Sequence, residues 1–295
     1  MSYFVRQMGH VSLQSPKPDA LVEDLVEIVG LKVTERSDRA IYLSCNDRHH
    51  EVSIVRGETA GVRSVGFEAM DNRAVDEVRR RVASKGFAIV SDHPSSERID
   101  HAFTFKLPNG AVFEVHTPVV RDQPKSNLGP GARPRRIEHV NLQVPDPEVT
   151  HDIITDVLGL KLSDETENKL FRWYRANDGY HHTIAVSPGE CRLHHYAFDM
   201  HSLQDLGRIA DILVAKDRAL LWGPGRHGAG GNVFTYFADA NGCVVETSVE
   251  MDRIENDDLY SARSWDMSQG TSGRWVNLWG TPPSQEWFVP GLNFI

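Results

Sequence analysis

The chain contains 295 residues, of which 40% are hydrophobic and 25% are charged, and its formal net charge at pH 7 is −9. This composition is that of a globular protein, and the length suits one large domain or two ordinary ones. The acidic balance argues against nucleic acid or an anionic membrane as a partner, because binding to phosphate requires clustered Lys and Arg.

The cysteines and the apolar segments indicate a reducing compartment. Cys45, Cys191 and Cys243 are odd in number and form no CxxC pair, which fits neither a disulfide framework nor a thiolate metal site. The N-terminus lacks an apolar core of signal-peptide length, and no run approaches the ~20 apolar residues that span a bilayer. We therefore expect a cytoplasmic protein without a membrane partner.

Strands and helices alternate in a repeating order. After a strand near residue 4, PDALVEDLVEIVGL predicts an amphipathic helix ending at Gly30, and AIYLSC and EVSIV predict short strands. A second strand precedes the helical pattern DNRAVDEVRRRVASKG and further strands. The second half repeats this order, with a helix over SLQDLGRIADILVAKD.

The segment 117–136 separates the two halves. Its prolines, glycines and basic residues are typical of an inter-domain linker, and we interpret Arg133, Arg135 and Arg136 as part of that solvated linker. The predicted parts are an N-terminal domain over 1–125, a catalytic domain over 132–250 and a C-terminal tail over 251–295.

The two halves are copies of one another. GHVSLQSP recurs as EHVNLQVP, which aligns His10 with His139, and HHEVSIV and NGAVFEV recur as HHTIAVS and NGCVVET. Each copy holds two βαβββ modules, so four modules account for residues 4–250. Paired modules of this kind curl their strands around a cavity. We expect an α+β fold with the chemistry on the cavity side of the strands.

The second half offers a set of metal ligands. Its strands carry His139, either His194 or His195, and Glu246. Two histidines and one carboxylate with open positions form the facial triad of non-haem Fe(II) enzymes of oxygen chemistry. The spacing alone is weak evidence, because a chain with 14 histidines yields chance trios.

The duplicate sharpens this prediction. Aligning SVGFEAM with HYAFDM places Ser64 opposite His195, so the first half keeps His10 and Glu114 but lacks the middle ligand. A degenerate copy beside an intact one predicts a metal site in the second half only.

The faces of one strand decide between the two adjacent histidines. Successive strand residues point to opposite faces, so His195 lies with Ala197 and Asp199, whereas Tyr196 and Phe198 lie on the other face. Small residues leave room for a cavity and large apolar ones pack against helices. We therefore expect His195 to be the ligand and His194 a packed or hydrogen-bonded neighbour.

Three further residues are candidates for acid, base and orienting roles. They are His182, His227 and Tyr236, and imidazole titrates near neutral pH. A purely structural role remains open for each of them, and His181 is interpreted as the packed neighbour of His182.

The motifs IEHVNLQV, YHHTIAV, LHHYAF, GPGRHG and TYFADANGCVVE occur in the order found in one family. The chain resembles the type I extradiol ring-cleaving dioxygenases of the vicinal-oxygen-chelate superfamily over residues 4–250. The resemblance implies that His139, His195 and Glu246 bind Fe(II), or alternatively Mn(II). It implies that His182 is the acid–base histidine and that His227 and Tyr236 donate hydrogen bonds.

The implied reaction inserts both atoms of O2 into a catecholic ring, next to the diol, and yields a hydroxymuconic semialdehyde-type product in aromatic catabolism. The implied partners are a small catechol and O2, and we expect a homo-oligomer. Other proteins of this superfamily remain alternatives: a glyoxalase-like or epimerase-like metalloenzyme, or a metal-free ligand-binding module.

GPGRHG and the tail resemble the homoprotocatechuate-type branch. That branch has a carboxylate-binding Arg just before this motif, where the chain has Trp222, and Arg274 is an alternative for that role. The tail holds Trp265, Trp275, Trp279 and Trp287, too many aromatic residues for a disordered end. We expect it to be a lid over the site or a subunit contact.

Overall fold

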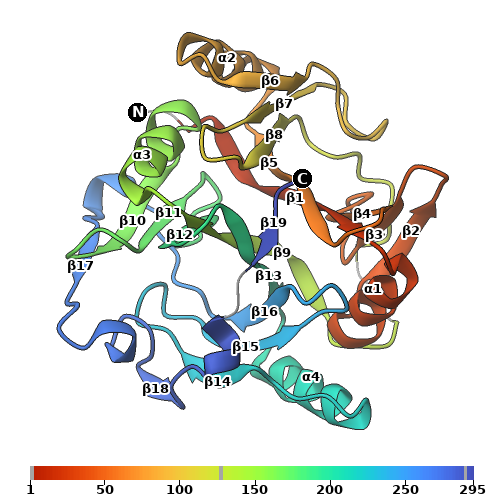
Figure 1. Ribbon diagram of the computed structural model, residues 1–295, viewed down its shortest axis with the longest axis vertical. Coiled ribbons are helices and arrows are strands. Elements are labelled where there is room, and N and C mark those ends of the chain that lie inside the picture. Colours follow the sequence, from red (N-terminus) through yellow and green to blue (C-terminus); the bar gives the residue numbers. More distant parts are fainter. Residues whose placement is uncertain (1–2, 126–128, 289–290) are drawn as a thin grey trace.

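The computed structural model describes residues 3–125, 129–288 and 291–295, and these contain four βαβββ modules (Figure 1). The first is β1 (Val5–Ser15), α1 (Pro18–Asp24), β2 (Lys32–Arg36), β3 (Ile41–Ser44) and β4 (Val52–Arg56). The second is β5 (Gly61–Ala69), α2 (Asn72–Ser84), β6 (Ala88–Ser91), β7 (Ala102–Lys106) and β8 (Val112–His116).

The second half has the same order. The third module is β9 (Pro134–Val144), α3 (Pro147–Asp152), β10 (Lys161–Thr166), β11 (Arg172–Arg175) and β12 (Ile184–Pro188). The fourth is β13 (Arg192–Met200), α4 (Leu203–Ala215), β14 (Trp222–Arg226), β15 (Val233–Ala238) and β16 (Val244–Val249). A π-helical turn extends α1 (η1, Leu25–Val29) and another extends α3 (η2, Ile153–Val157).

Each half forms one curled mixed sheet. The strand order is β2-β3-β4-β1-β5-β8-β7-β6 in the first half, and the second half repeats it as β10-β11-β12-β9-β13-β16-β15-β14. The two modules of a half meet through their first strands, which pair antiparallel as β1 with β5 and β9 with β13. The helices lie around the periphery in Figure 1. The predicted α+β fold of paired modules is therefore confirmed.

The helix boundaries follow local signals. Pro18 occupies the first turn of α1, and Gly30 ends η1 in the left-handed conformation with φ 97°. The Asp71 side chain accepts a hydrogen bond from the backbone N–H of Ala74 at the start of α2. Ser202 and Asp205 form a capping box at the start of α4.

The arginines next to the linker differ from the prediction. Arg133 is exposed, but Arg135 and Arg136 belong to β9. Arg135 lies 3.2 Å from a carboxylate oxygen of Asp199, and Arg136 lies 2.5 Å from one of Asp178. Arg133 and Arg135 are exposed, as interpreted, but the interpretation as solvated was wrong for Arg136, whose side chain is only 12% exposed, and β9 begins at Pro134, before Arg135.

The tail extends the second sheet. β17 (Arg263–Trp265) pairs with β10, β18 (Trp279–Gly280) with β14, and β19 (Leu292–Asn293) with β13. A short 3-10 turn, η3 (Asp257–Leu259), precedes β17, and two others, η4 (Gly270–Ser272) and η5 (Gln285–Phe288), lie between the tail strands. Among the described residues, no helix is both long and apolar enough to cross a membrane.

We predict opposite effects of two Gly→Ala substitutions on the free energy of unfolding, measured by urea denaturation. A Cβ at Gly9 in β1 would lie 2.0 Å from Nε2 of buried His116, so Gly9→Ala is expected to destabilise by about 1–3 kcal/mol. A Cβ at Gly207 in α4 would meet no atom within 4 Å, so Gly207→Ala is expected to stabilise by about 0.5–1 kcal/mol. A neutral Gly9→Ala variant would contradict this account.

Candidate functional site

Three polar side chains from adjacent strands converge at the centre of the second sheet. His139 comes from β9, His195 from β13 and Glu246 from β16, and all three are at least 97% buried. Nε2 of His139 lies 3.1 Å from Oε2 of Glu246, and Nε2 of His195 lies 3.2 Å from the same oxygen. One ligand atom from each residue lies within 4.8 Å of the others, so the group could hold a metal ion. We call these three residues the triad.

The strand faces distinguish His195 from His194. Tyr196 and Phe198 are fully buried in the hydrophobic core, whereas His195 turns its Nε2 toward Glu246. Nε2 of His194 instead lies 3.1 Å from the carbonyl oxygen of Trp287, and the two neighbouring rings approach at Nδ1 to 2.8 Å. The structure thus brings together the three residues that the sequence analysis selected.

The electrostatics of the triad are those of a buried anion between two imidazoles. Burial alone would raise the pKa of Glu246, but His139 and His195 hold it well below its usual range. Burial alone would lower the pKa of His139, yet the carboxylates of Glu246 and Glu138 raise it to about 9. Without a metal ion, a proton therefore occupies the space between these groups. A divalent cation can replace that proton.

Glu138 and Asn232 hold the triad, and the sequence analysis missed both. Oε2 of Glu138 lies 3.1 Å from Nδ1 of His139 and accepts a hydrogen bond from Oγ of Ser248 at 2.6 Å. With Nδ1 protonated toward Glu138, displacement of the proton between Nε2 and Glu246 leaves the Nε2 lone pair available to a metal. Asn232 donates to the second oxygen of Glu246 at 2.9 Å. No local signal pointed to either, because adjacent strand residues are expected to face opposite ways and Asn232 lies in a loop.

His182, His227 and Tyr236 lie around the triad. The ring of His182, in the loop before β12, is 4.3 Å from the ring of His139, centroid to centroid. His227 Nδ1 donates to the carbonyl of Val276 at 2.5 Å, which leaves Nε2 to accept from the Tyr236 hydroxyl at 2.9 Å.

The two histidines around the triad are uncharged near neutral pH. Burial, together with His139 and His181, holds the pKa of His182 well below its usual range. Burial lowers the pKa of His227 to about 4, against the pull of Glu246. His181 points away and lies 3.2 Å from a carboxylate oxygen of Asp164.

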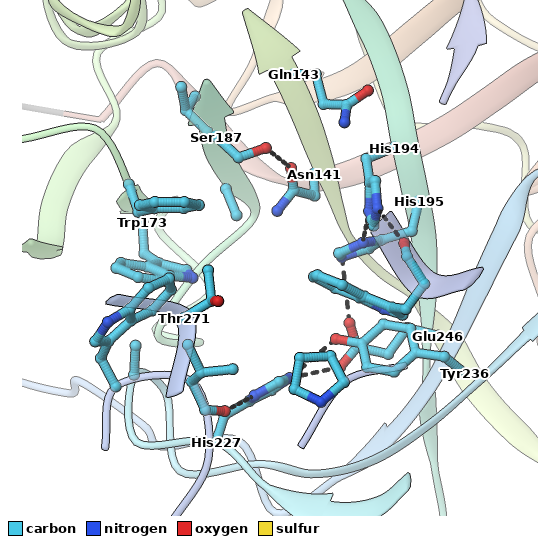
Figure 2. Close-up of a pocket in the computed structure, with 18 of the residues that line it drawn as sticks. Asn141, Gln143, Trp173, Ser187, His194, His195, His227, Tyr236, Glu246 and Thr271 are labelled. Carbon is cyan, nitrogen blue, oxygen red and sulfur yellow. Dashed lines mark hydrogen bonds and ion pairs between the residues drawn. The ribbon is translucent and has the colours of Figure 1, made fainter. Parts of the chain in front are cut away.

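The triad opens into a pocket of about 240 Å³ (Figure 2). Beyond the triad, the pocket is lined by polar side chains and by aromatic and aliphatic ones from β11, β12, β14 and the tail: Asn141, Gln143, Phe171, Trp173, His182, Ala185, Val186, Ser187, Pro188, His194, Trp222, His227, Ala229, Tyr236, Thr271, Trp275, Val276, Pro283, Trp287 and Phe288. On the aromatic side, Trp222 and the tail residues Trp275 and Trp287 were named from the sequence, whereas Phe171 and Trp173 were not.

Trp222 and Arg274 have different locations. Trp222 lines the pocket and stacks on Tyr236 with 5.3 Å between ring centroids and an interplanar angle of 7°. Arg274 is exposed and lies outside the set of lining residues. The suggestion that Arg274 replaces the carboxylate-binding Arg was therefore wrong, because its side chain faces solvent.

The corresponding pair in the first half is buried and has no third ligand. Nε2 of His10 lies 3.0 Å from Oε2 of Glu114, while Ser64 occupies the position equivalent to His195. A Cβ on Gly66 would lie 2.4 Å from the ring of His10, so this ring fills the space that the methyl group of Ala197 takes in the second half. Among the described residues, the triad is the group of ligands that converges closely enough for a metal ion.

Comparisons with known proteins agree with this architecture. Residues 136–247 match the model of the Glyoxalase/Bleomycin resistance protein/Dioxygenase superfamily. The chain is 28% identical over 273 residues to the manganese-dependent 2,3-dihydroxybiphenyl 1,2-dioxygenase of Geobacillus genomosp. 3, with 81% of this chain and 83% of the relative covered.

Two solved structures share the fold. The Mn(II)-bound glyoxalase from Novosphingobium aromaticivorans superposes with a TM-score of 0.88 at 28% identity, with 99% of this chain and 97% of that one covered. Homoprotocatechuate 2,3-dioxygenase from Brevibacterium fuscum, in complex with 3,4-dihydroxyphenylacetate, gives 0.89 at 19% identity, with 99% and 93% covered. The recognition made from the motifs is confirmed by these likenesses, and the match to the superfamily model covers residues 136–247.

Proposed function

We propose that this protein is an extradiol dioxygenase that inserts both atoms of O2 into a catecholic ring next to the diol, with Fe(II), or Mn(II) in its place, at the triad. The observation that carries the proposal is the convergence of His139, His195 and Glu246 on the same pocket as uncharged His182 and the His227–Tyr236 pair. The named dioxygenase relative supports the same reaction class.

The donor set fits such an ion. Two imidazoles and one carboxylate suit Fe(II) or Mn(II), and three protein ligands leave coordination positions open toward the pocket. Held by the triad, such an ion would bind the catechol oxygens and O2 and would acidify the hydroxyl groups.

The protein's own residues orient the substrate and manage its protons. Because the Tyr236 proton points to His227, the lone pairs of the Tyr236 oxygen are available to accept a hydrogen bond from a substrate hydroxyl. Burial, with the Glu246 carboxylate, raises the pKa of Tyr236, so the phenol stays protonated. Neutral His182 holds or donates a proton beside His139.

A glyoxalase-like reaction is the second candidate, because a Mn(II)-bound glyoxalase matches nearly the whole chain.

Oxygen uptake separates the dioxygenase from the glyoxalase-like enzyme. Protein loaded with Fe(II) under anaerobic conditions is expected to consume O2 with a catechol and to form a coloured ring-opened product. Iron-loaded protein that consumes no O2 with any catechol would favour the glyoxalase-like reaction. Protein that binds no metal would favour a metal-free ligand-binding module. The homo-oligomer stays a prediction.

Glu246→Gln is expected to abolish stoichiometric metal binding, because it removes the charged ligand of the triad. The matched control is Glu114→Gln at the equivalent position of the first half, which should keep its metal. Elemental analysis of both purified variants checks this. Full metal content in Glu246→Gln would remove Glu246 from the ligand set.

His182→Phe is expected to retain the metal and to lower kcat by about 10²–10⁴-fold, because the ring then carries no proton for transfer. His50→Phe, the equivalent change in the first half, should leave kcat near that of the parent protein. Steady-state oxygen uptake with parallel metal analysis checks both. An unchanged rate in His182→Phe would reject the acid–base role.

Glu138→Gln is expected to weaken Mn(II) binding by about 10–100-fold, because the neutral amide no longer raises the basicity of His139. Asp239→Asn tests the loss of another buried carboxylate in the same sheet, one that accepts from Tyr196 and not from the triad. Titration monitored by the electron paramagnetic resonance of free Mn(II) measures both affinities. Equal affinities in the two variants would contradict this role of Glu138.

A further inference from the structure

The pocket has an aromatic side opposite the triad. Trp173 lies across the cavity from His195 and Tyr236 in Figure 2. The Trp275 ring centroid lies 5.8 Å from that of Trp173 and 4.6 Å from that of Phe171. We call Phe171, Trp173 and Trp275 the aromatic wall. Two of its members come from β11 and its loop and the third comes from the tail, so it is fixed by two distant segments.

The pocket contains no arginine or lysine among its described lining residues. Its polar side chains beyond the triad and the histidines are the uncharged Asn141, Gln143, Ser187 and Thr271, with the Tyr236 hydroxyl. A carboxylate on the substrate would enter a pocket that already holds the carboxylate of Glu246. Burying a charge without a counter-charge is unfavourable.

Two arginines on segments that contribute lining residues are themselves outside the lining. Arg192 lies two residues before His194 on β13, but it is ion-paired with Glu190. Arg274 is exposed and outside the lining. Trp222 directly precedes the GPGRHG motif and donates its indole N–H to the carbonyl of Thr281 at 2.7 Å.

We propose that the substrate is an uncharged catechol that carries an apolar aromatic substituent, seated against the aromatic wall. This inference rests on the proposed function, because the diol is taken to face the triad. A second ring gains offset or edge-to-face contacts with Trp173 and its neighbours. A pocket lined mainly by apolar and aromatic side chains, with few polar groups to orient the ligand, favours an uncharged aromatic ligand.

The test compares three catechols on the metal-loaded full chain, by oxygen uptake. One carries a phenyl group, one an acetate side chain, and one the methyl ester of that acetate. The ester is expected to exceed the acid in kcat/KM by about 10–100-fold, because binding of the acid buries a negative charge without a counter-charge and binding of the ester does not. The phenyl compound is expected to exceed both. An acid used as well as its ester would overturn the inference.

A pair of variants tests the aromatic wall. Trp173→Leu is expected to reduce the advantage of the phenyl compound over the ester by about 3–10-fold, while the ester-to-acid ratio stays unchanged. Trp279→Leu is the control, because Trp279 is a tail tryptophan with 49% exposure outside the lining. An equal phenyl advantage in both variants would remove Trp173 from substrate selection.

Anaerobic titration calorimetry separates failure of this inference from failure of the proposed function. If no catechol supports oxygen uptake, the proposed function fails, but the dissociation constants of the three compounds still rank the pocket's preference. Tighter binding of the phenyl compound than of the acid supports the inference. Equal or tighter binding of the acid overturns it.

Discussion

The pairing of β9, β13 and β16 is the constraint on which the rest of the site depends. Ala197 pairs with Glu246 across β13 and β16, and β9 pairs antiparallel on the other side of β13. This register sets the two imidazoles of the triad around one carboxylate oxygen. Because a change of register by one residue turns every side chain to the other face, the metal ligands and the hydrophobic core are fixed together. Glu138 and Asn232 then fix the orientation of groups that the sheet has already placed.

The first half shows what the same framework does without its middle ligand. His10 and Glu114 still meet, but the His10 ring lies over Gly66 and the space beside Ser64 holds no second imidazole ligand. The contrast extends to the supporting groups. Gly9 replaces Glu138, and the His116 ring lies where a side chain at Gly9 would be. The pair of His10 and Glu114 thus persists as a buried element in one copy, whereas the triad of the other copy lines a pocket.

The tail joins the sheet to the pocket. Its strands pair with β10, β14 and β13, and residues between those strands supply one side of the cavity. Trp287 accepts from His194 through its carbonyl, and Val276 accepts from His227 in the same way. The tail therefore holds two pocket histidines as well as enclosing the substrate. Central strands carry the groups proposed for chemistry, and β11, its preceding loop and the tail carry the aromatic wall proposed for selection.

The sequence by itself determined the modules and the three residues of the triad. Helix periodicity, capping residues and strand alternation are local, and the internal duplication showed which histidine had no counterpart in the first half. Only the tertiary structure decided what surrounds them. The contact of His139 with Glu246 joins residues 107 positions apart, and the aromatic wall joins β11 to the tail. The pairing of Arg136 with Asp178 was likewise invisible in a basic segment after a proline-rich linker. Such contacts depend on strand order, bulges and register across the sheet, and no local pattern encodes which distant side chains will meet.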